Sequence, residues 1–201
     1  MSTYSALQSR IADDLDRTDL SSQIQQQIKQ AIRHYRGHRL AFNETRSTLT
    51  ATTSQEYVSP PSDLIAIDRL YITRSSYNEL LIPLPVNEII EGRRTSNATP
   101  TAYCLYGDRI ELDCPASTTF SMPIYYLKEL TELSANSDTN GWTTEGEDLI
   151  VVRAEKILYA RVVKDSKRAG ECGILEREAY NSLRLASNRR VSQGQAVPCY
   201  P

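Results

Sequence analysis

The chain of 201 residues has few of the residues on which most catalytic sites depend. It contains two histidines and eight glycines, and no glycines fall in the GxGxxG or GxxxxGK spacings that cradle phosphates. No serine or cysteine stands in a nucleophile motif such as GxSxG. These absences make an enzyme the weaker class of function. The enzyme alternative that remains is a hydrolase that depends on His34 or His38.

Long apolar runs are absent as well. No stretch approaches the roughly 18 to 20 continuous apolar residues that span a membrane. The first residues, MSTYSALQSRIADD, are polar where a signal peptide has its apolar core. We therefore expect a protein made in the cytosol without membrane contact. No CxxC pair or zinc spacing links the cysteines, which predicts free thiols. These are Cys104, Cys114, Cys172 and Cys199.

The net charge of −2 hides two regions of opposite sign. Residues 1–150 carry 13 Lys and Arg against 20 Asp and Glu, a balance of −7. Residues 151–201 carry 10 against 5, a balance of +5. Opposite charges on one subunit favour head-to-tail self-association or an acidic partner. Nucleic acid is the competing explanation, but acidic residues interrupt the basic region, whereas a DNA-binding stripe is more uniform.

Two amphipathic helices are predicted at the start of the chain. Apolar residues recur at helical spacing after Ser2 and Thr3, either of which can cap the first helix; they are Tyr4, Leu7, Ile11 and Leu15. Asp19, Ser21 or Ser22 can cap the second helix, which ends at Gly37. Its apolar stripe is Leu20, Ile24, Ile28, Ala31, Ile32 and Tyr35. The short connection predicts an antiparallel pair.

A long region with a period of two follows and predicts antiparallel strands. Residues 64–73 indicate a buried strand with a bulge between Ile67 and Leu70. Pro85 opens a short helix that stops at Gly92. Pro123 predicts that the strand of residues 120–126 lies at an edge or begins near this proline.

A hairpin is predicted around the turn at Gly107 and Asp108. Its register pairs Tyr103 with Leu112, Leu105 with Ile110 and Cys104 with Glu111, so that the apolar side chains gather on one face.

A small polar loop, residues 134–141, leads to the only tryptophan. Loops displayed on a rigid platform of strands usually make contacts, so the candidate contact residues are Asn136, Asp138, Asn140 and Trp142. The side-chain oxygens of Asn136, Asp138 and Asn140 alternate as in a calcium-binding loop, but the glycine and the distal glutamate of such a loop do not fall at the required offsets.

His34 and His38 have the i, i+4 spacing of metal ligands, although their place at a basic helix end suits the helix dipole. We predict no metal and no cofactor.

The helical period returns after the loop. Thr144 and Glu147 fit a capping box for a helix that reaches Val162. Gly170 and Gly173 bracket a predicted turn before a last helix, whose apolar positions are Leu175, Ala179, Leu183 and Ala186. Residues 191–201 have no periodicity, which predicts either a frayed end or an arm that orders only on binding.

The predicted fold class is α+β. Residues 1–40 and 143–190 form a helical bundle from both ends of the chain, residues 41–142 form an inserted antiparallel β lobe, and residues 191–201 form an extended C-terminal arm. The outer helices bury their stripes by packing on each other. This layout favours a binding or assembly role over an enzymatic one.

Several segments resemble the head-to-tail adaptor proteins of tailed bacteriophages. They are the hairpin YCLYGDRIELDCP, the segment PIYYLKELTELSANSDTNGW, the helix DLIVVRAEKILYARVV and the opening run LQSRIADDLDRTDLSSQIQQQIKQAI. The resemblance implies a ring, expected to be a dodecamer, between portal and tail in the virion, with a channel that passes the genome and contacts DNA non-specifically. Assembly in the host cytoplasm is implied.

The resemblance also implies two partner surfaces. The portal protein is contacted through the helical part and the C-terminal arm, with the candidate residues Arg189, Arg190, Val191, Gln193, Val197, Tyr200 and Pro201. The β lobe and the loop that ends at Trp142 meet the tail, nozzle or stopper protein. The alternatives are a neck, stopper or tail accessory protein, or a carbohydrate-binding module of the tail.

Overall fold

The computed structural model describes residues 2–192, which divide into two compact units. The helical unit comprises Met1–Asn43 and Leu130–Pro201, and the β unit comprises Glu44–Glu129. The predicted α+β class is confirmed. The second boundary differs from the predicted one, because residues 130–142 group with the helices.

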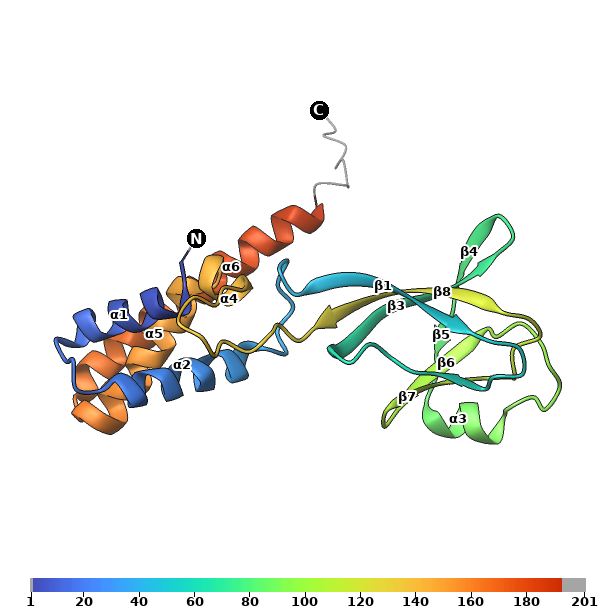
Figure 1. Ribbon diagram of the computed structural model, residues 1–201, viewed down its shortest axis with the longest axis horizontal. Helices are drawn as coiled ribbons and strands as arrows, with labels where there is room; N and C mark the ends of the chain where they lie inside the picture. Colours follow the sequence, from blue (N-terminus) through green and yellow to red (C-terminus); the bar gives the residue numbers. More distant parts are fainter. Residues whose placement is uncertain (1, 193–201) are drawn as a thin grey trace, which may run out of the picture. The chain divides into compact units, whose positions relative to one another are not determined.

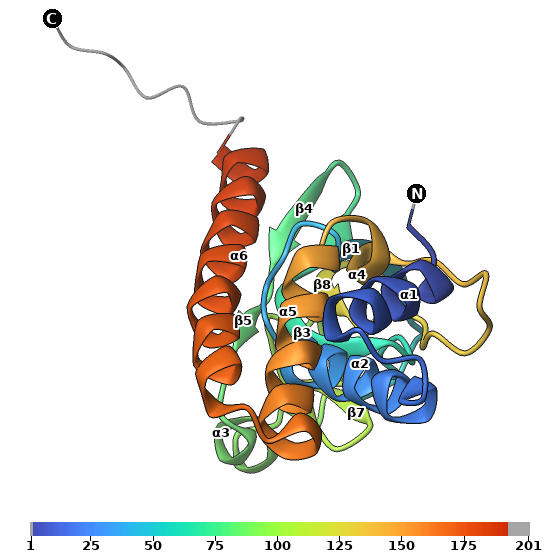
Figure 2. The same cartoon turned by 90° about the vertical axis from the view of Figure 1, so that its left-hand side faces the viewer.

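The helical unit contains α-helices and one π-helical turn. In chain order they are α1 (Tyr4–Leu15), α2 (Ser21–Tyr35), α4 (Gly141–Thr144), α5 (Glu147–Leu158), η1 (Tyr159–Val163) and α6 (Ser166–Ser192). Figure 1 shows α1 and α2 beside α5, and Figure 2 shows α6 running along α5. One buried apolar cluster joins these helices and includes Leu7, Ile28, Ile150 and Leu158.

The start of α1 follows the sequence pattern, and the start of α2 does not. The Thr3 hydroxyl accepts a hydrogen bond from the Ala6 N–H at 3.3 Å, which confirms Thr3 as a cap. Leu20 occupies the N-cap position of α2 without a side-chain hydrogen bond, so the predicted Asp19, Ser21 or Ser22 cap is wrong. Asp19 instead binds the Arg17 guanidinium at 2.7 Å, which competes with capping.

The turn predicted at Gly170 and Gly173 is also wrong, since α6 runs through both residues. A glycine within a helix costs about 1 kcal/mol relative to alanine, and the packing of α6 on α5 offsets this cost. Cys172 and Glu176 are buried on that side of α6. Tertiary contact therefore overrides the local preference.

The β unit has two four-stranded sheets among its described residues. The first has the order β1-β8-β3-β4 and the second the order β2-β7-β6-β5. The elements are β1 (Glu44–Ala51), β2 (Tyr57–Val58), β3 (Leu64–Arg74), β4 (Tyr77–Leu80), β5 (Ile82–Pro83), α3 (Val86–Glu91), β6 (Ala102–Tyr106), β7 (Arg109–Leu112) and β8 (Phe120–Lys128). One core joins residues of both sheets, including Leu70, Ile124, Ile110 and Leu112. β5 pairs with β6 in parallel, so the lobe is not antiparallel throughout.

The hairpin register is confirmed, with Tyr103 opposite Leu112 and Cys104 opposite Glu111. The pairing of Leu105 with Ile110 is also observed, but Leu105 is exposed near the turn and does not join the core. Cys104, Cys114 and Cys172 are free, as predicted, and all three are buried; Cys199 lies outside the described residues.

Two expectations about the first sheet have different outcomes. The bulge in β3 is confirmed by a register shift between Ile67 and Arg69. The edge position predicted for β8 is wrong, because β8 pairs with both β1 and β3. Pairing with β3 reaches only to Ile124, however, so β8 has a single strand neighbour at Pro123. A missing N–H is tolerated at such a local edge.

Among the described residues, none of the helices has the length and apolar content needed to cross a membrane.

Candidate interaction surfaces

The loop before Trp142 lies in the helical unit, so its predicted place on the β lobe is wrong. Its backbone caps α1: the Tyr4 N–H donates to the Asp138 carbonyl at 2.9 Å, and the Ser5 N–H donates to the Asn136 carbonyl at 3.0 Å. The first N–H groups of a helix have no partner within the helix, which explains why the loop folds back onto α1.

The side chains of Asp138 and Asn140 in the loop form hydrogen bonds with nearby backbone N–H groups. The Asp138 carboxylate accepts the N–H groups of Ser134 at 2.8 Å and Ala135 at 2.7 Å. These backbone hydrogen bonds hold the pKa of Asp138 below its usual value. Asn140 caps α4, with its side-chain oxygen accepting the Trp142 N–H at 2.9 Å. The capping box of α4 joins Asn140 and Thr143. The predicted box of Thr144 and Glu147 is wrong, because Gly146 occupies the N-cap position of α5 and no side chain caps that helix.

Trp142 is a core residue. It is 2% exposed and meets the Phe42 ring edge to face at 4.9 Å between centroids. Among the four predicted contact residues of the loop, Asn136 presents an exposed side chain, whereas Trp142 does not. The loop is thus a structural connection with a small exposed surface.

Replacing Asn140 by alanine is expected to destabilise the helical unit by about 1 to 2 kcal/mol, the usual loss for a helix N-cap. The change also removes the bond from the Asn140 amide to the Thr131 carbonyl. Urea unfolding followed by Trp142 fluorescence measures the effect. The matched control is Asn136→Ala, which removes an exposed amide and is expected to change stability by less than about 0.5 kcal/mol. Equal effects of both variants would contradict the capping role.

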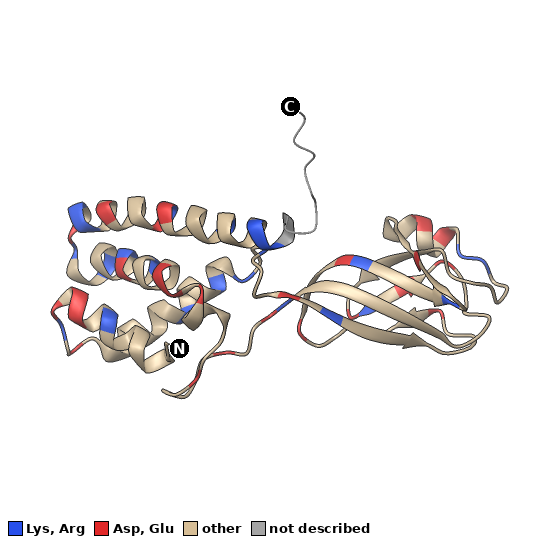
Figure 3. Ribbon diagram, turned by 90° about the horizontal axis from the view of Figure 1, so that it is seen from above, with Lys and Arg blue, Asp and Glu red and all other residues tan. Residues whose placement is uncertain are grey.

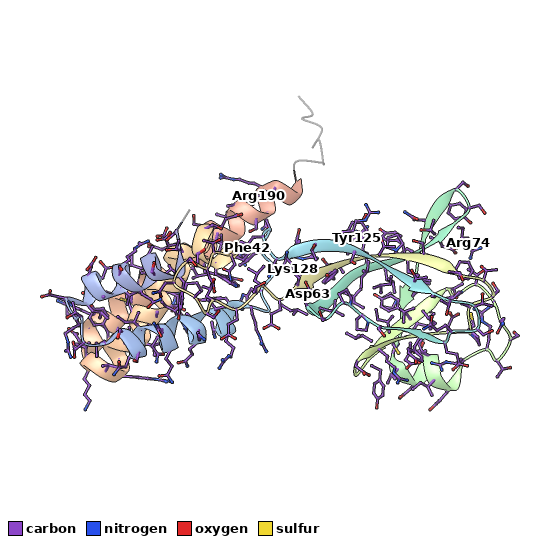
Figure 4. The ribbon with its side chains drawn as sticks, in the orientation of Figure 1. Phe42, Asp63, Arg74, Tyr125, Lys128 and Arg190 are labelled. Carbon is purple, nitrogen blue, oxygen red and sulfur yellow. The ribbon has the colours of Figure 1, made fainter. Side chains whose placement is uncertain are left out.

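The C-terminal part of α6 is fastened to the helical unit. The Ser187 hydroxyl accepts the Ala41 N–H at 3.1 Å, and Arg190 pairs with Glu145 at 2.9 Å. Figure 4 labels Arg190 near the end of α6. The helix extends through Val191, so the predicted arm begins later than residue 191. Arg189 also lies on α6. Gln193, Val197, Tyr200 and Pro201 lie outside the described residues.

A cluster of arginines and tyrosines that was not predicted from the sequence lies on the outer face of the first sheet. We name Arg46, Arg69, Tyr71, Leu80 and Tyr125 the sheet face. Its members come from β1, β3, β4 and β8 and are paired in register. The Arg46 guanidinium lies 5.5 Å from the centre of the Tyr125 ring, and the Tyr71 and Tyr125 rings are 5.8 Å apart. Arg and Tyr are enriched among the residues that dominate protein interfaces.

The buried ionic groups of the helical unit hold its helices together. Glu176 on α6 accepts hydrogen bonds from Tyr35 at 2.6 Å, Arg153 at 2.8 Å and Lys156 at 2.7 Å. Burial raises the pKa of Glu176, but the bonds from Lys156, Tyr35 and Arg153 outweigh it and keep the pKa below the usual value. This network connects α2, α5 and α6, and Figure 3 shows both signs of charge on α5 and α6.

The described cysteines are buried, and His38 contacts a tyrosine. Burial raises the pKa of Cys172 to about 11, and burial also raises the pKa values of Cys104 and Cys114, which makes these thiols poor nucleophiles. His38 lies within hydrogen-bonding distance of the Tyr180 hydroxyl, at 2.9 Å. Within residues 2–192, no three His, Cys, Asp or Glu side chains converge as a metal-binding group.

Comparison with known proteins gives one decisive match. The family model described as "SU10 adaptor protein" matches residues 2–196, nearly the whole chain. The chain belongs to the SU10 adaptor protein family. The predicted resemblance to bacteriophage head-to-tail adaptors is thereby confirmed. No curated protein matches the chain.

As a member of the SU10 adaptor family, the protein belongs to a family of structural adaptors rather than of enzymes. The match includes both units and all three surfaces described above: the loop before Trp142, the C-terminal part of α6 and the sheet face.

Proposed function

We propose that this protein is a structural head-to-tail adaptor that forms a dodecameric ring between the portal and the tail of a bacteriophage. The ring surrounds the channel through which the genome passes, and it contacts that DNA without sequence preference. The observation that carries the proposal is the family match over residues 2–196. The protein acts in the neck of the virion after assembly in the host cytoplasm.

Portal binding is assigned to the C-terminal segment, residues 189–201. Its starting point is held on the helical unit by the Arg190–Glu145 ion pair and by Ser187. Val197 and Tyr200 supply spaced apolar groups for a groove in the partner. A segment attached to a fixed helix is restricted in position, which lowers the entropy cost of docking.

The contact with the next tail component is assigned to the β unit and to the exposed part of the loop at Asn136. Trp142 supports the loop from the core and does not contact the partner directly. A substitution of Trp142 is therefore a test of folding rather than of tail binding.

Removing residues 193–201 is expected to abolish binding to the portal protein of the same phage. The helical unit is expected to stay folded, because the contacts that fasten α6, including Ser187 and Arg190, lie before the cut. Electron microscopy and sedimentation of portal mixed with adaptor measure the occupancy. The matched control replaces Gln195 alone by alanine and keeps the full length; Gln195 is not among the candidate portal-binding residues, and this variant is expected to bind normally. A truncated chain that still decorates portals with full occupancy would contradict the assignment.

A further inference from the structure

The sheet face is an uncovered surface with unpaired positive charge. Tyr125 points away from the core of the β unit, since its neighbours Ile124 and Tyr126 both belong to that core. Figure 4 shows Tyr125 on the outer side of β1 and β8. No ion pair joins Arg46 or Arg69 to another described residue; the Arg69 guanidinium donates a hydrogen bond to the Tyr71 hydroxyl at 3.5 Å, and the charge of the adjacent Asp68 also acts on it. Leu80 adds an apolar group that is 50% exposed.

A second surface of the β unit has the opposite charge. We name Ile82, Glu88, Ile90 and Glu91 the α3 face. Ile82 and Ile90 are 58% and 53% exposed, so both offer apolar surface to a partner. Glu88 and Glu91 are exposed on α3 and form no ion pair within the described part of the chain. The neighbouring Arg93 binds Glu56 and Glu111, so it does not neutralise the two glutamates.

The sheet face and the α3 face lie on opposite sides of the β unit. The core of the unit separates the two sheets. Behind the second sheet, Ile89 of α3 packs on Ala102 and Cys104 of β6. The register of β5 places Ile82 beside Ala102, hence on this same side. Figure 1 shows the same order, with the first sheet, the second sheet and then α3.

We propose that the sheet face of one copy binds the α3 face of the next copy, so that this contact joins the β units around the ring. The inference rests on the proposed ring and names the surfaces that close it. Two arginines meet two glutamates, and Leu80 and the two tyrosines meet Ile82 and Ile90. Different faces on opposite sides of one subunit make a heterologous contact, which generates rings when the rotation closes. A two-fold dimer through either face would instead bring like charges together.

Charge reversal on one face at a time tests this contact. The variant R46E/R69E has two acidic faces, and the variant E88K/E91K has two basic faces. Each variant alone is expected to assemble on the portal on the order of a hundredfold more weakly than the wild type, because like charges oppose each other at every contact. An equimolar mixture is expected to restore rings with alternating subunits, which an even-numbered ring allows. Native mass spectrometry of decorated portals measures the copy number and the composition.

The controls separate this inference from the proposed function. The variant R161E/K164E makes the same change of net charge as R46E/R69E, but at exposed positions of the helical unit, and is expected to assemble like the wild type. Circular dichroism shows whether each variant is folded. If both single-face variants form full rings, or if the folded variants fail to assemble when mixed, the contact is wrong while the adaptor function stands. If the wild type itself never decorates the portal, the proposed function fails, and the contact fails with it.

Discussion

Replacing Glu176 by alanine is expected to destabilise the helical unit by about 3 kcal/mol, the lower end of the range for breaking a buried ion pair. Glu176 is buried and accepts hydrogen bonds from three helix side chains, those of Tyr35, Arg153 and Lys156. Its removal leaves two positive charges and one hydroxyl without their common acceptor. Arg153 and Lys156 are partly exposed and can turn toward water, which places the loss at the lower end.

Urea unfolding followed by tryptophan fluorescence measures this loss of stability in the helical unit. Trp142 is the only tryptophan of the chain and lies in the core of the helical unit. The matched control is Glu178→Ala, since Glu178 is exposed on the same helix; it is expected to change stability by less than about 0.5 kcal/mol. A second variant, Tyr35→Phe, removes one of the three hydrogen bonds and is expected to cost about 1 to 2 kcal/mol. If Glu176→Ala unfolds at the same urea concentration as Glu178→Ala, the network does not hold the helices together.

Features that depend on local periodicity were predictable from the sequence. The stripe of α1 and its Thr3 cap, the bulge in β3 and the register of the hairpin all follow from residues close in the chain. A one-residue slip of the hairpin would move Leu112 out of the core, so the pattern specifies the register strongly.

The predictions were wrong where contacts between residues far apart in the chain determine the structure. The place of the loop at residues 134–141 depends on backbone carbonyls that cap α1, more than a hundred residues earlier in the chain, and no side-chain pattern encodes this. Gly170 and Gly173 stay helical because α6 packs on α5. The sheet face could not be predicted without the strand order β1-β8-β3, which brings Arg46 and Arg69 to either side of Tyr125. The alternation of side chains within one strand does not indicate which strands are neighbours.

The stability of the helical unit is expected to fall as the pH rises through the neutral range, and Glu155→Gln is expected to reduce this fall. Glu155 of α5 is 7% exposed, and one of its carboxyl oxygens is buried without a hydrogen-bond partner. Burial raises the pKa of Glu155 to about 8, with a further contribution from the hydrogen bond and the charge of Asp14 on α1; Arg10 acts in the opposite direction. The buried thiol of Cys172 on α6 lies nearby and stays protonated, since burial and then the charge of Glu155 raise its pKa.

The fall of stability with rising pH follows from proton linkage. The folded chain keeps the proton on Glu155 up to about pH 8, whereas the unfolded chain releases it near the ordinary value of 4.5. The contribution of Glu155 to the stability of the helical unit is therefore fully present below about pH 4.5, and it is lost as the pH rises through about 8. The reason is that the folded state binds more protons than the unfolded state in this pH window. At about 1.4 kcal/mol for each pH unit, the wild type loses on the order of 3 kcal/mol relative to Glu155→Gln between pH 5 and pH 8. Glutamine keeps the shape and a donor for Asp14 but carries no titrating proton.

Urea unfolding at pH 5, 6.5 and 8, again followed by Trp142, measures this difference. The advantage of Glu155→Gln over the wild type is expected to grow at each step. Asp13→Asn is the matched control, because Asp13 is an exposed carboxylate on α1 beside Asp14; its removal is expected to leave the wild-type pH profile in place. A constant difference between Glu155→Gln and the wild type at all three pH values would mean that Glu155 does not bind its proton more tightly in the folded chain. In that case the contact between α1 and α5 carries a charge in its interior, and Arg10 would have to be its partner.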